Sequence, residues 1–499
     1  MKKIVYSFIA FLALAVSISS CKKDYLDTVP TSAVSADVVT ASADNMLLAL
    51  NGIHRSMYIR YNSQGEGGYG GIMIINDMLG EDLVMTEAGN GWYNNIYKWA
   101  DHRNPTDGDL LYPWRVYYRI IANANVLING SGAATGDPAK IKAIVGQALV
   151  YRAWAHFQLV QLYAKRYNTG GGNTQLGVPI MLENTTAGLA RSTVEEVYTA
   201  INTDLASAVT NLTGYVRPNK SHFSVEVVKG IQARVALTQG KYAEAATLAA
   251  AARTGFALMN AATYKLGFND YKVSEWMWGS NLIEDQTTYF AHFGAYMSRN
   301  FSSTNIRTNP KAMNSLLFNA LPATDARRQL VSATGNDHVF PAGYTAMTSS
   351  FLKRPYTSQK FLAYGPSDSR MDVPYMRSGE MYLIEAEAKA RLAAQDAAGA
   401  QQALYDLNIT RDPSYVKSTL TGQALIDHIM IYRRAELWGE GFRFNDLKRL
   451  NLALDRTGAN HKDALTAGLF SVPAGDIRWE WLIPQSELDA NELMVQNPL

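Results

Sequence analysis

Two alanine-rich segments separated by a single glycine constrain the fold of this chain most strongly. Residues 224–240 and 241–253 both place apolar side chains at helical spacing. Gly240 lies between them and suits the backbone conformation that ends a helix. Small alanine side chains allow two such helices to approach closely. The pattern therefore predicts an antiparallel helix pair and a mainly α-helical protein.

A second pair of the same kind is predicted at residues 378–392 and 398–408. The turn glycine followed by Tyr242 and an alanine stripe resembles the inter-helix turn of tetratricopeptide repeats. Ordinary antiparallel helix hairpins are the alternative. Helical spacing predicts four further helices, at residues 43–58, 113–127, 140–163 and 193–212.

Two segments lack a sustained helical period. Residues 255–369 mix aromatic, Asn, Ser, Thr and Gly residues over a length too great for a simple loop, so we expect an irregular region with short helices that presents a surface. Residues 61–71 form a glycine-rich segment, and we expect a loop there. It contains the letters G-x-G-x-x-G, but no strand precedes it, so a dinucleotide site is not expected.

The N-terminus has the pattern of a secretory signal. Lys2 and Lys3 precede an uncharged run from Ile4 to Ser20, which ends at Cys21, the single cysteine of the chain. The sequence at this point resembles the lipobox of bacterial lipoproteins, in which the cysteine carries the lipid. A transmembrane anchor is the alternative, although 17 uncharged residues are short for a span of about 20. We expect residues 1–20 to be a signal peptide and Cys21 to be lipidated.

Composition narrows the class of partner. Loss of residues 1–20 removes two of the 46 basic residues and leaves them equal in number to the 44 acidic ones. A balanced charge argues against nucleic acid as the main ligand. With Cys21 consumed by lipid, the chain can form no internal disulfide bond. Its stability must therefore come from its core.

No catalytic or metal-ligating pattern is present in the sequence. The eight histidines show no H-E-x-x-H or other zinc spacing, and no G-x-S-x-G nucleophile motif occurs. Paired carboxylates are expected by chance among 44 acidic residues. We therefore expect no catalytic residues, no metal and no cofactor, and a secreted hydrolase is the least favoured class.

Four segments in order resemble the SusD/RagB family of outer-membrane nutrient-binding lipoproteins. Residues 21–30 match the family's Cys, spacer, Leu-Asp, Pro start. Residues 375–387 and 433–449 match its helix and its Arg-Arg-x-Glu-Leu, Glu-Gly, Arg-x-x-Asp-Leu block, and residues 481–498 match its Ile-Pro-x-x-Glu to Gln-Asn-Pro ending. The matches extend over nearly the whole mature chain.

The resemblance implies a SusD-like α/α fold and a binding function. It implies capture of oligosaccharides and their delivery to a partner, a SusC-like TonB-dependent barrel, with lipid anchorage on the outer membrane facing the cell exterior. A surface adhesin or peptide-binding lipoprotein on the same scaffold is the alternative. The expected regions are a tether (21–45), an N-terminal helical region (46–254), an irregular insertion (255–369) and a C-terminal helical region (370–499).

The block at residues 433–449 is interpreted as structural. Opposite charges recur in it at helical spacing, which predicts that Arg433 pairs with Glu436 and Glu440 with Arg443. Burying such charges unpaired would cost several kcal/mol, so we expect them to be paired.

Sugar-binding surfaces combine an aromatic platform with amide or charged groups around it. Two segments have this composition, one near residue 92 and one within residues 271–296. Exposure is most expected beside Gly91 and the two asparagines that follow. The candidate ligand-contact residues are Trp92, Tyr93, Asn95, Tyr97, Trp276 and Tyr289.

Overall fold

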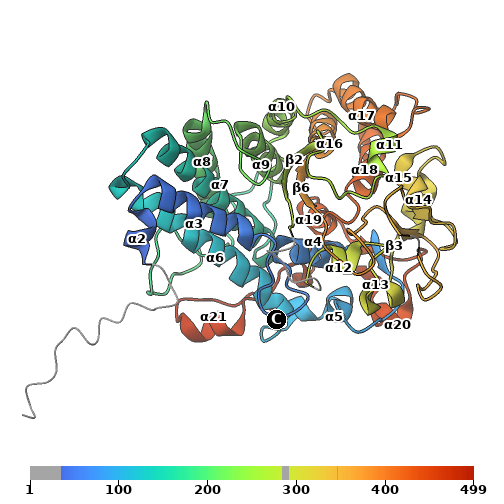
Figure 1. Ribbon diagram of the computed structural model, residues 1–499, viewed down its shortest axis with the longest axis horizontal. Coiled ribbons are helices and arrows are strands. Elements are labelled where there is room, and N and C mark those ends of the chain that lie inside the picture. Colours follow the sequence, from blue (N-terminus) through green and yellow to red (C-terminus); the bar gives the residue numbers. More distant parts are fainter. Residues whose placement is uncertain (1–34, 284–290, 346) are drawn as a thin grey trace, which may run out of the picture.

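Helices dominate the computed structural model, which describes residues 35–283, 291–345 and 347–499 (Figure 1). The prediction of a mainly α-helical fold is confirmed. Cys21, the tether before residue 35 and Tyr289 lie outside the described residues. Within them, no helix is both long enough and apolar enough to cross a bilayer.

The N-terminal half holds the longest helices, and residues 43–58, 113–127, 140–163 and 193–212 all lie in helices much as predicted. The helix α8 begins with a capping box, in which the Thr193 hydroxyl accepts from the Glu196 backbone and the Glu196 carboxylate accepts from the Thr193 backbone. The helices are α2 (Ala36–Thr40), α3 (Ala43–Ser56), α4 (Gly68–Met78), α5 (Asn94–Tyr97), α6 (Gly108–Gly130), α7 (Pro138–Tyr163), α8 (Val194–Leu212), α9 (Val225–Thr238) and α10 (Tyr242–Ala252).

The second half contains shorter helices and short strands. Strand β2 pairs antiparallel with β6, β1 pairs with β3, and β5 lies between β3 and β4. The helices are α11 (Ala261–Tyr264), α12 (Gly294–Met297), α13 (Thr304–Thr308), α14 (Ser315–Ala320), α15 (Ala326–Gln329), α16 (Ser378–Ala390), α17 (Ala397–Arg411), α18 (Gly422–Glu436), α19 (Arg443–Arg449), α20 (Asp463–Thr466) and α21 (Gln485–Ala490). The strands are β1 (Leu83–Met85), β2 (Trp276–Ser280), β3 (Lys311–Met313), β4 (Val331–Ser332), β5 (Thr357–Ser358), β6 (Val373–Arg377), β7 (Leu454–Asp455) and β8 (Ser471–Val472).

Both predicted helix pairs form. Helices α9 and α10 are joined at Gly240, which has φ of +72°, and α16 packs against α17. Helix α10 also packs against α16, so that the two pairs lie side by side along one edge of the molecule (Figure 1). Buried alanines such as Ala245 and Ala249 line α10, which is how the helices come close.

The expected loop at residues 61–71 is partly wrong, because α4 already begins at Gly68. Every residue of α4 is buried, and Gly68 itself has φ of +56°. A side chain at Gly68 would meet the backbone carbonyl of Met57 at 2.2 Å, and one at Gly71 would meet that of Gly65 at 2.6 Å. The glycines therefore allow the backbone of this central helix to pack closely against its neighbours. A glycine-rich composition is also typical of loops, which is why the sequence predicted a loop here.

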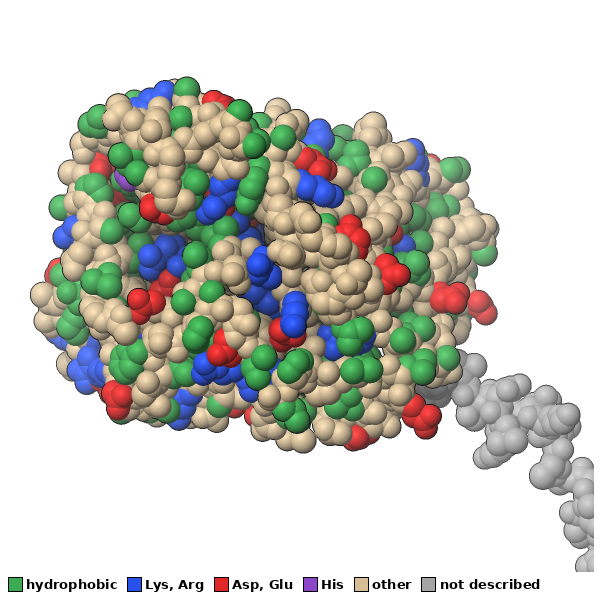
Figure 2. Space-filling view, turned by 180° about the vertical axis from the view of Figure 1, so that it is seen from behind, with side chains coloured by type: hydrophobic (Ala, Val, Ile, Leu, Met, Phe, Trp, Pro, Cys, Tyr) green, Lys and Arg blue, Asp and Glu red, His purple; other side chains and the backbone are tan. Residues whose placement is uncertain are grey.

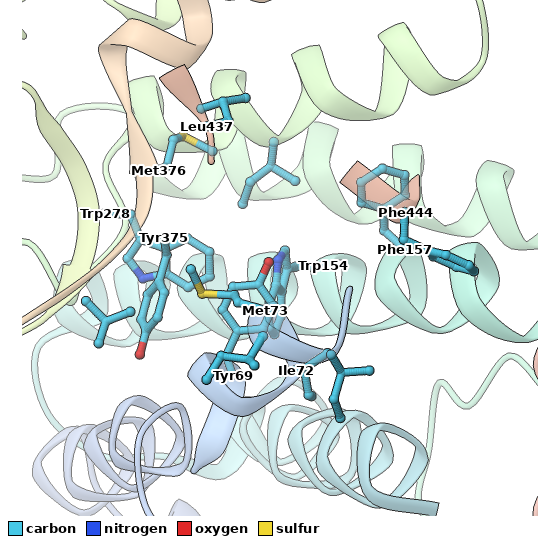
Figure 3. Packing of buried hydrophobic residues seen from close by; sticks show 14 of the residues in the cluster. Tyr69, Ile72, Met73, Trp154, Phe157, Trp278, Tyr375, Met376, Leu437 and Phe444 are labelled. Atoms are coloured by element: carbon cyan, nitrogen blue, oxygen red, sulfur yellow. The ribbon is translucent and has the colours of Figure 1, made fainter. Parts of the chain in front are cut away.

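One hydrophobic cluster extends from Met46 to Met494. Its centre is aromatic (Figure 3): Trp154 on α7 lies edge-on to Trp278 on β2, with 5.5 Å between ring centroids, and Tyr375 on β6 lies 5.1 Å from Trp278. Edge-to-face pairs of this kind contribute roughly 0.5–1.5 kcal/mol each beyond the area they bury. The cluster joins segments from both ends of the chain into a single core.

A buried network of charges lies beside this core. Arg377, at the end of β6, is fully buried and donates to the carboxylates of Glu275, Glu436 and Glu440. Arg411 reaches two of the same carboxylates, Glu275 and Glu436. Each charge is thus compensated by partners from other elements, which is the condition under which buried ions are tolerated.

The pairs predicted inside the 433–449 block are wrong, although its charges are paired. Arg433 donates to Asp446 at 2.7 Å. Arg443 reaches Glu81, and the predicted partner of Arg443, Glu440, accepts from Lys360 at 2.7 Å instead. The block contains the last residues of α18 and the whole of α19, with a turn between them. Charges at helical spacing in the sequence therefore face different neighbours.

The C-terminal segment is fixed to the N-terminal half by polar contacts. The buried amide of Asn497 donates to the backbone carbonyls of Tyr163 and Trp481, each at 2.7 Å. Arg191 donates to the Asn497 amide oxygen at 2.8 Å and also to the Tyr163 carbonyl. The last residues of the chain thus form contacts with α7 and with the loop before α8.

Charged side chains of both signs are spread over the face seen from behind, with Lys and Arg gathered near its middle (Figure 2). This distribution agrees with the balanced composition of the chain.

Candidate functional site

The candidate site is the surface around Trp92, where the loop before α5 meets α12 and the loop before α4. The chain reaches Trp92 through Gly91, which has φ of +96°, and leaves it through Tyr93, which has φ of +62°. These two residues, both with left-handed backbone conformation, turn the chain sharply at Trp92. As a result the Trp92 ring lies on the protein surface, half-buried rather than enclosed.

The Trp92 ring is held from below by two contacts. A side chain at Gly65 would lie 3.3 Å from the ring, so the glycine lets the backbone come beneath it. Tyr296 of α12 lies edge-on to Trp92, with 6.1 Å between centroids, and edge-on to Tyr93, at 5.2 Å. Tyr93 donates its hydroxyl hydrogen to the Gly65 carbonyl at 2.9 Å. The platform is therefore rigid before any ligand arrives.

Asn95, three residues along the chain from Trp92, supplies an exposed amide. It lies in the first turn of α5, and its carbonyl oxygen accepts from the Lys98 ammonium at 3.4 Å. The Asn95 side chain also lies near the Asp101 carboxylate, whose pKa it lowers against the larger effect of burial. An aromatic ring beside an amide and carboxylates is the combination that recognises the apolar face and the hydroxyls of a sugar.

Three carboxylates, those of Asp101, Asp107 and Asp109, lie next to Asn95 with their oxygens within 4.8 Å of one another. Burial, and then repulsion by Asp107, raises the pKa of Asp101 to about 6. Burial, followed by repulsion from Asp101, Asp107 and Glu66, raises the pKa of Asp109 to about 7. The spacing would allow the group to hold a cation, and carboxylates alone commonly occur without one.

This group of carboxylates was not predicted, although the sequence contains these three aspartates within nine residues. The positions of these three aspartates in the sequence match no known spacing of metal-binding residues. The turn through the short 3-10 helix Asp101–Arg103 and the start of α6 brings them together.

The other candidate residues differ in exposure. Tyr93 is 4% exposed, and Tyr97 and Trp276 are at most 1% exposed. Tyr97 lies between α4 and the C-terminal region, where its hydroxyl pairs with His461. Trp276 lies in β2 within the core. Tyr93, Tyr97 and Trp276 present almost no ring surface to a ligand, whereas Trp92 exposes part of its ring and Asn95 exposes its amide.

Asp109→Asn is expected to stabilise the protein at pH 8 and to have little effect at pH 4. Because the folded-state pKa of about 7 exceeds the unfolded value near 4, the folded protein binds more protons between these values. The free energy of unfolding therefore falls as pH rises through this window. Asparagine removes the loss, which is roughly 4 kcal/mol for a difference of about three pKa units and is smaller to the extent that solvent screens this partly exposed carboxylate. Urea unfolding at both pH values measures it.

The exposed Asp427→Asn on α18 serves as the control for this experiment. Equal effects of the Asp109→Asn substitution at pH 4 and pH 8 would show that burial and repulsion do not act on Asp109 as described.

Comparison with known proteins supports one family over the whole described chain. Residues 24–237 match a family model described as "Starch-binding associating with outer membrane", and residues 234–499 match the model of the SusD family. The chain belongs to the SusD family. SusD family proteins bind ligands without catalysis, so the prediction of a binding protein rather than an enzyme is confirmed.

Individual members of the SusD family resemble the chain over their full lengths. "SusD-like protein P2" of Formosa agariphila is 25% identical, with both chains fully covered. A SusD-like carbohydrate-binding protein of Bacteroides vulgatus has a TM-score of 0.78 at 25% identity, covering 91% of this chain and 97% of its own. A SusD superfamily protein of Bacteroides thetaiotaomicron has a TM-score of 0.75 at 24% identity, covering 92% and 100%.

Proposed function

We propose that this SusD family protein captures oligosaccharides at the cell surface through the Trp92 platform and delivers them to a SusC-like TonB-dependent barrel. The observation that carries the proposal is the half-buried Trp92 ring, packed edge-on against Tyr296, with the exposed Asn95 amide three residues further along the chain. Tyr296 and Gly65 hold the ring in place without a ligand. Such preorganisation lowers the entropy lost on binding.

The relatives support a glycan rather than a peptide as ligand. One is described as a carbohydrate-binding protein, and another, with a TM-score of 0.65 at 20% identity, as a laminarin-binding SusD-like protein. The platform itself adds an argument, because sugar C–H faces stack on an aromatic ring while amides bind the hydroxyls. A peptide-binding or adhesive role remains the alternative.

The anchor belongs to the same proposal. Cys21 is the only thiol in the chain and follows an uncharged run of signal-peptide length. Acylation at Cys21 would hold the protein at the outer membrane, since two or more acyl chains are enough for stable anchoring. The polar residues that follow would keep the folded part outside the bilayer, and an orientation facing the exterior is what membership of the SusD family implies.

Trp92→Ala is expected to weaken oligosaccharide binding by about 2 kcal/mol, which is roughly 30-fold in the dissociation constant. The loss follows from removal of the stacking surface. Isothermal titration calorimetry with maltohexaose, laminarihexaose, xylohexaose and mannohexaose measures it. Tyr364→Ala, at another ring that is half exposed, is the matched control and should leave affinity unchanged.

Equal affinity of Trp92→Ala and the unaltered protein for every sugar that binds would remove Trp92 from the site. Binding of unstructured peptides but of none of the four sugars would favour the alternative role.

A further inference from the structure

A large groove lies apart from the Trp92 surface, between α3, the first half of α7 and the loop that joins α8 to α9. Its volume is about 1340 Å³, which exceeds the range usual for small-molecule sites. Neither α5 nor α12 contributes to its lining. The groove is therefore a second hollow, large enough for several sugar rings.

The floor of the groove is a hydrogen-bonded chain of neutral groups. The Gln147 carbonyl oxygen accepts from the backbone N–H of Phe223 at 3.2 Å, which fixes the orientation of its amide. His222 lies 3.0 Å from the same oxygen through Nδ1, so His222 must donate there. His54 Nε2 lies 3.3 Å from the same Nδ1 atom and can only share its single hydrogen as a second, weaker acceptor, so the Nδ1 atom of His54 donates to Tyr151.

This order of donors leaves the Nε2 atom of His222 as an unprotonated acceptor on a side chain that lines the groove. Burial, with a smaller contribution from the Arg217 charge, lowers the pKa of His222 to about 4, so the ring is neutral at physiological pH. Arg217 donates to the carbonyls of His222 and Met277 and holds the loop in this position. The floor thus presents a fixed acceptor for a hydroxyl group.

The walls combine rings with amides. Tyr215 and Tyr271 are half-buried, each with part of its ring exposed. Asn51 and Asn219 add exposed amide groups. Among the charged side chains of the lining, three are cations and one, Asp137, is an acid that caps α7. A cationic ligand is therefore disfavoured, and polyhydroxyl chemistry matches the neutral groups.

We propose that this groove is a second oligosaccharide-binding site, in which Tyr215 stacks on a sugar ring and His222 accepts a hydroxyl hydrogen. It would bind another stretch of the same glycan class that the Trp92 site captures. The inference rests on the proposed function only for the class of ligand. The two sites have separate side chains and can be lost separately.

Gly52 offers a way to close the groove without disturbing the fold. It is exposed on α3, it lines the groove, and a Cβ built on it meets no atom within 4 Å. Gly52→Trp places a large ring in the hollow. Gly132→Trp adds the same ring at another exposed glycine with nothing within 4 Å, outside the groove, and is the matched control.

The experiment uses the Trp92→Ala protein, so that binding at the first site does not hide the second. Calorimetry with the same four hexasaccharides is expected to show residual binding of at least one sugar. Gly52→Trp and Tyr215→Ala should each weaken this residual binding at least tenfold, whereas Gly132→Trp leaves it unchanged. Hydrogen exchange of residues 211–222 should slow when the sugar is added.

The possible results distinguish the second site from the proposed function. Binding that Trp92→Ala abolishes entirely overturns the second site and leaves the proposed function intact. Residual binding that Gly52→Trp and Gly132→Trp affect equally also overturns it, and would leave the groove as a surface for a protein partner. Absence of sugar binding by the unaltered protein would count against both proposals.

Discussion

Replacing Arg377 by methionine is expected to lower the free energy of unfolding by about 3–5 kcal/mol. Arg377 is 1% exposed and donates to three carboxylates, at 2.5 Å to Glu275, 2.9 Å to Glu436 and 2.6 Å to Glu440. Methionine fills much of the space but leaves these carboxylates short of a positive charge. The penalty is that of buried, uncompensated anions rather than of a lost contact.

The surface pair of Arg354 and Glu87 provides the control for Arg377→Met. Their closest atoms are 2.6 Å apart, yet both side chains are about one-third exposed (36% and 32%). Arg354→Met should therefore cost less than about 1 kcal/mol. Urea unfolding followed by circular dichroism compares the two variants. A similar loss of unfolding free energy in both variants would mean that burial does not raise the cost of removing the positive charge from the Arg377 network.

Gly441→Ala is expected to lower the free energy of unfolding by about 3 kcal/mol. Gly441 has φ of +83°, which costs an L-residue about 1–2 kcal/mol. An added Cβ would also lie 2.7 Å from the Cα of Met73 on α4, and such overpacking costs typically 1–3 kcal/mol. The backbone of α4 cannot move aside easily, because every residue of that helix is buried.

Gly422→Ala separates the two causes. Gly422 has a similar positive φ of +60°, but nothing lies within 4 Å of its added Cβ. The variant should lose only the conformational part, about 1–2 kcal/mol. Thermal and urea unfolding of both variants give the difference. Equal losses would show that contact with Met73 contributes nothing.

The helix pairs were predictable because local rules decide them. The alanine stripe, Gly240 and the Thr193 cap all act over a few residues, and the sequence shows them directly. Partners of the buried charges were not predictable, since Arg443 meets Glu81 from a segment more than 360 residues away. Only packing of the whole chain creates such pairs.

The candidate site was likewise predictable only in part from the sequence. Trp92 and Asn95 could be selected because Gly91 and the following asparagines indicate an exposed turn. Tyr97 has the same kind of neighbours in sequence, but it is the last residue of the single-turn helix α5 and is buried, with Arg456 over its ring at 4.3 Å. Composition indicates that a segment is aromatic and polar. It does not indicate which ring faces solvent.

The contacts of Asn497 set an order on folding. Its amide binds backbone groups of α7 and of residue 481, and Arg191 completes the contact. These bonds join the C-terminal end of the chain to residues 163 and 191 of its N-terminal half, so these contacts of α7 and of the loop before α8 cannot form until residue 497 is available. A chain that crosses a membrane with its N-terminus first would therefore emerge without these contacts. It would form them only after translocation is nearly complete.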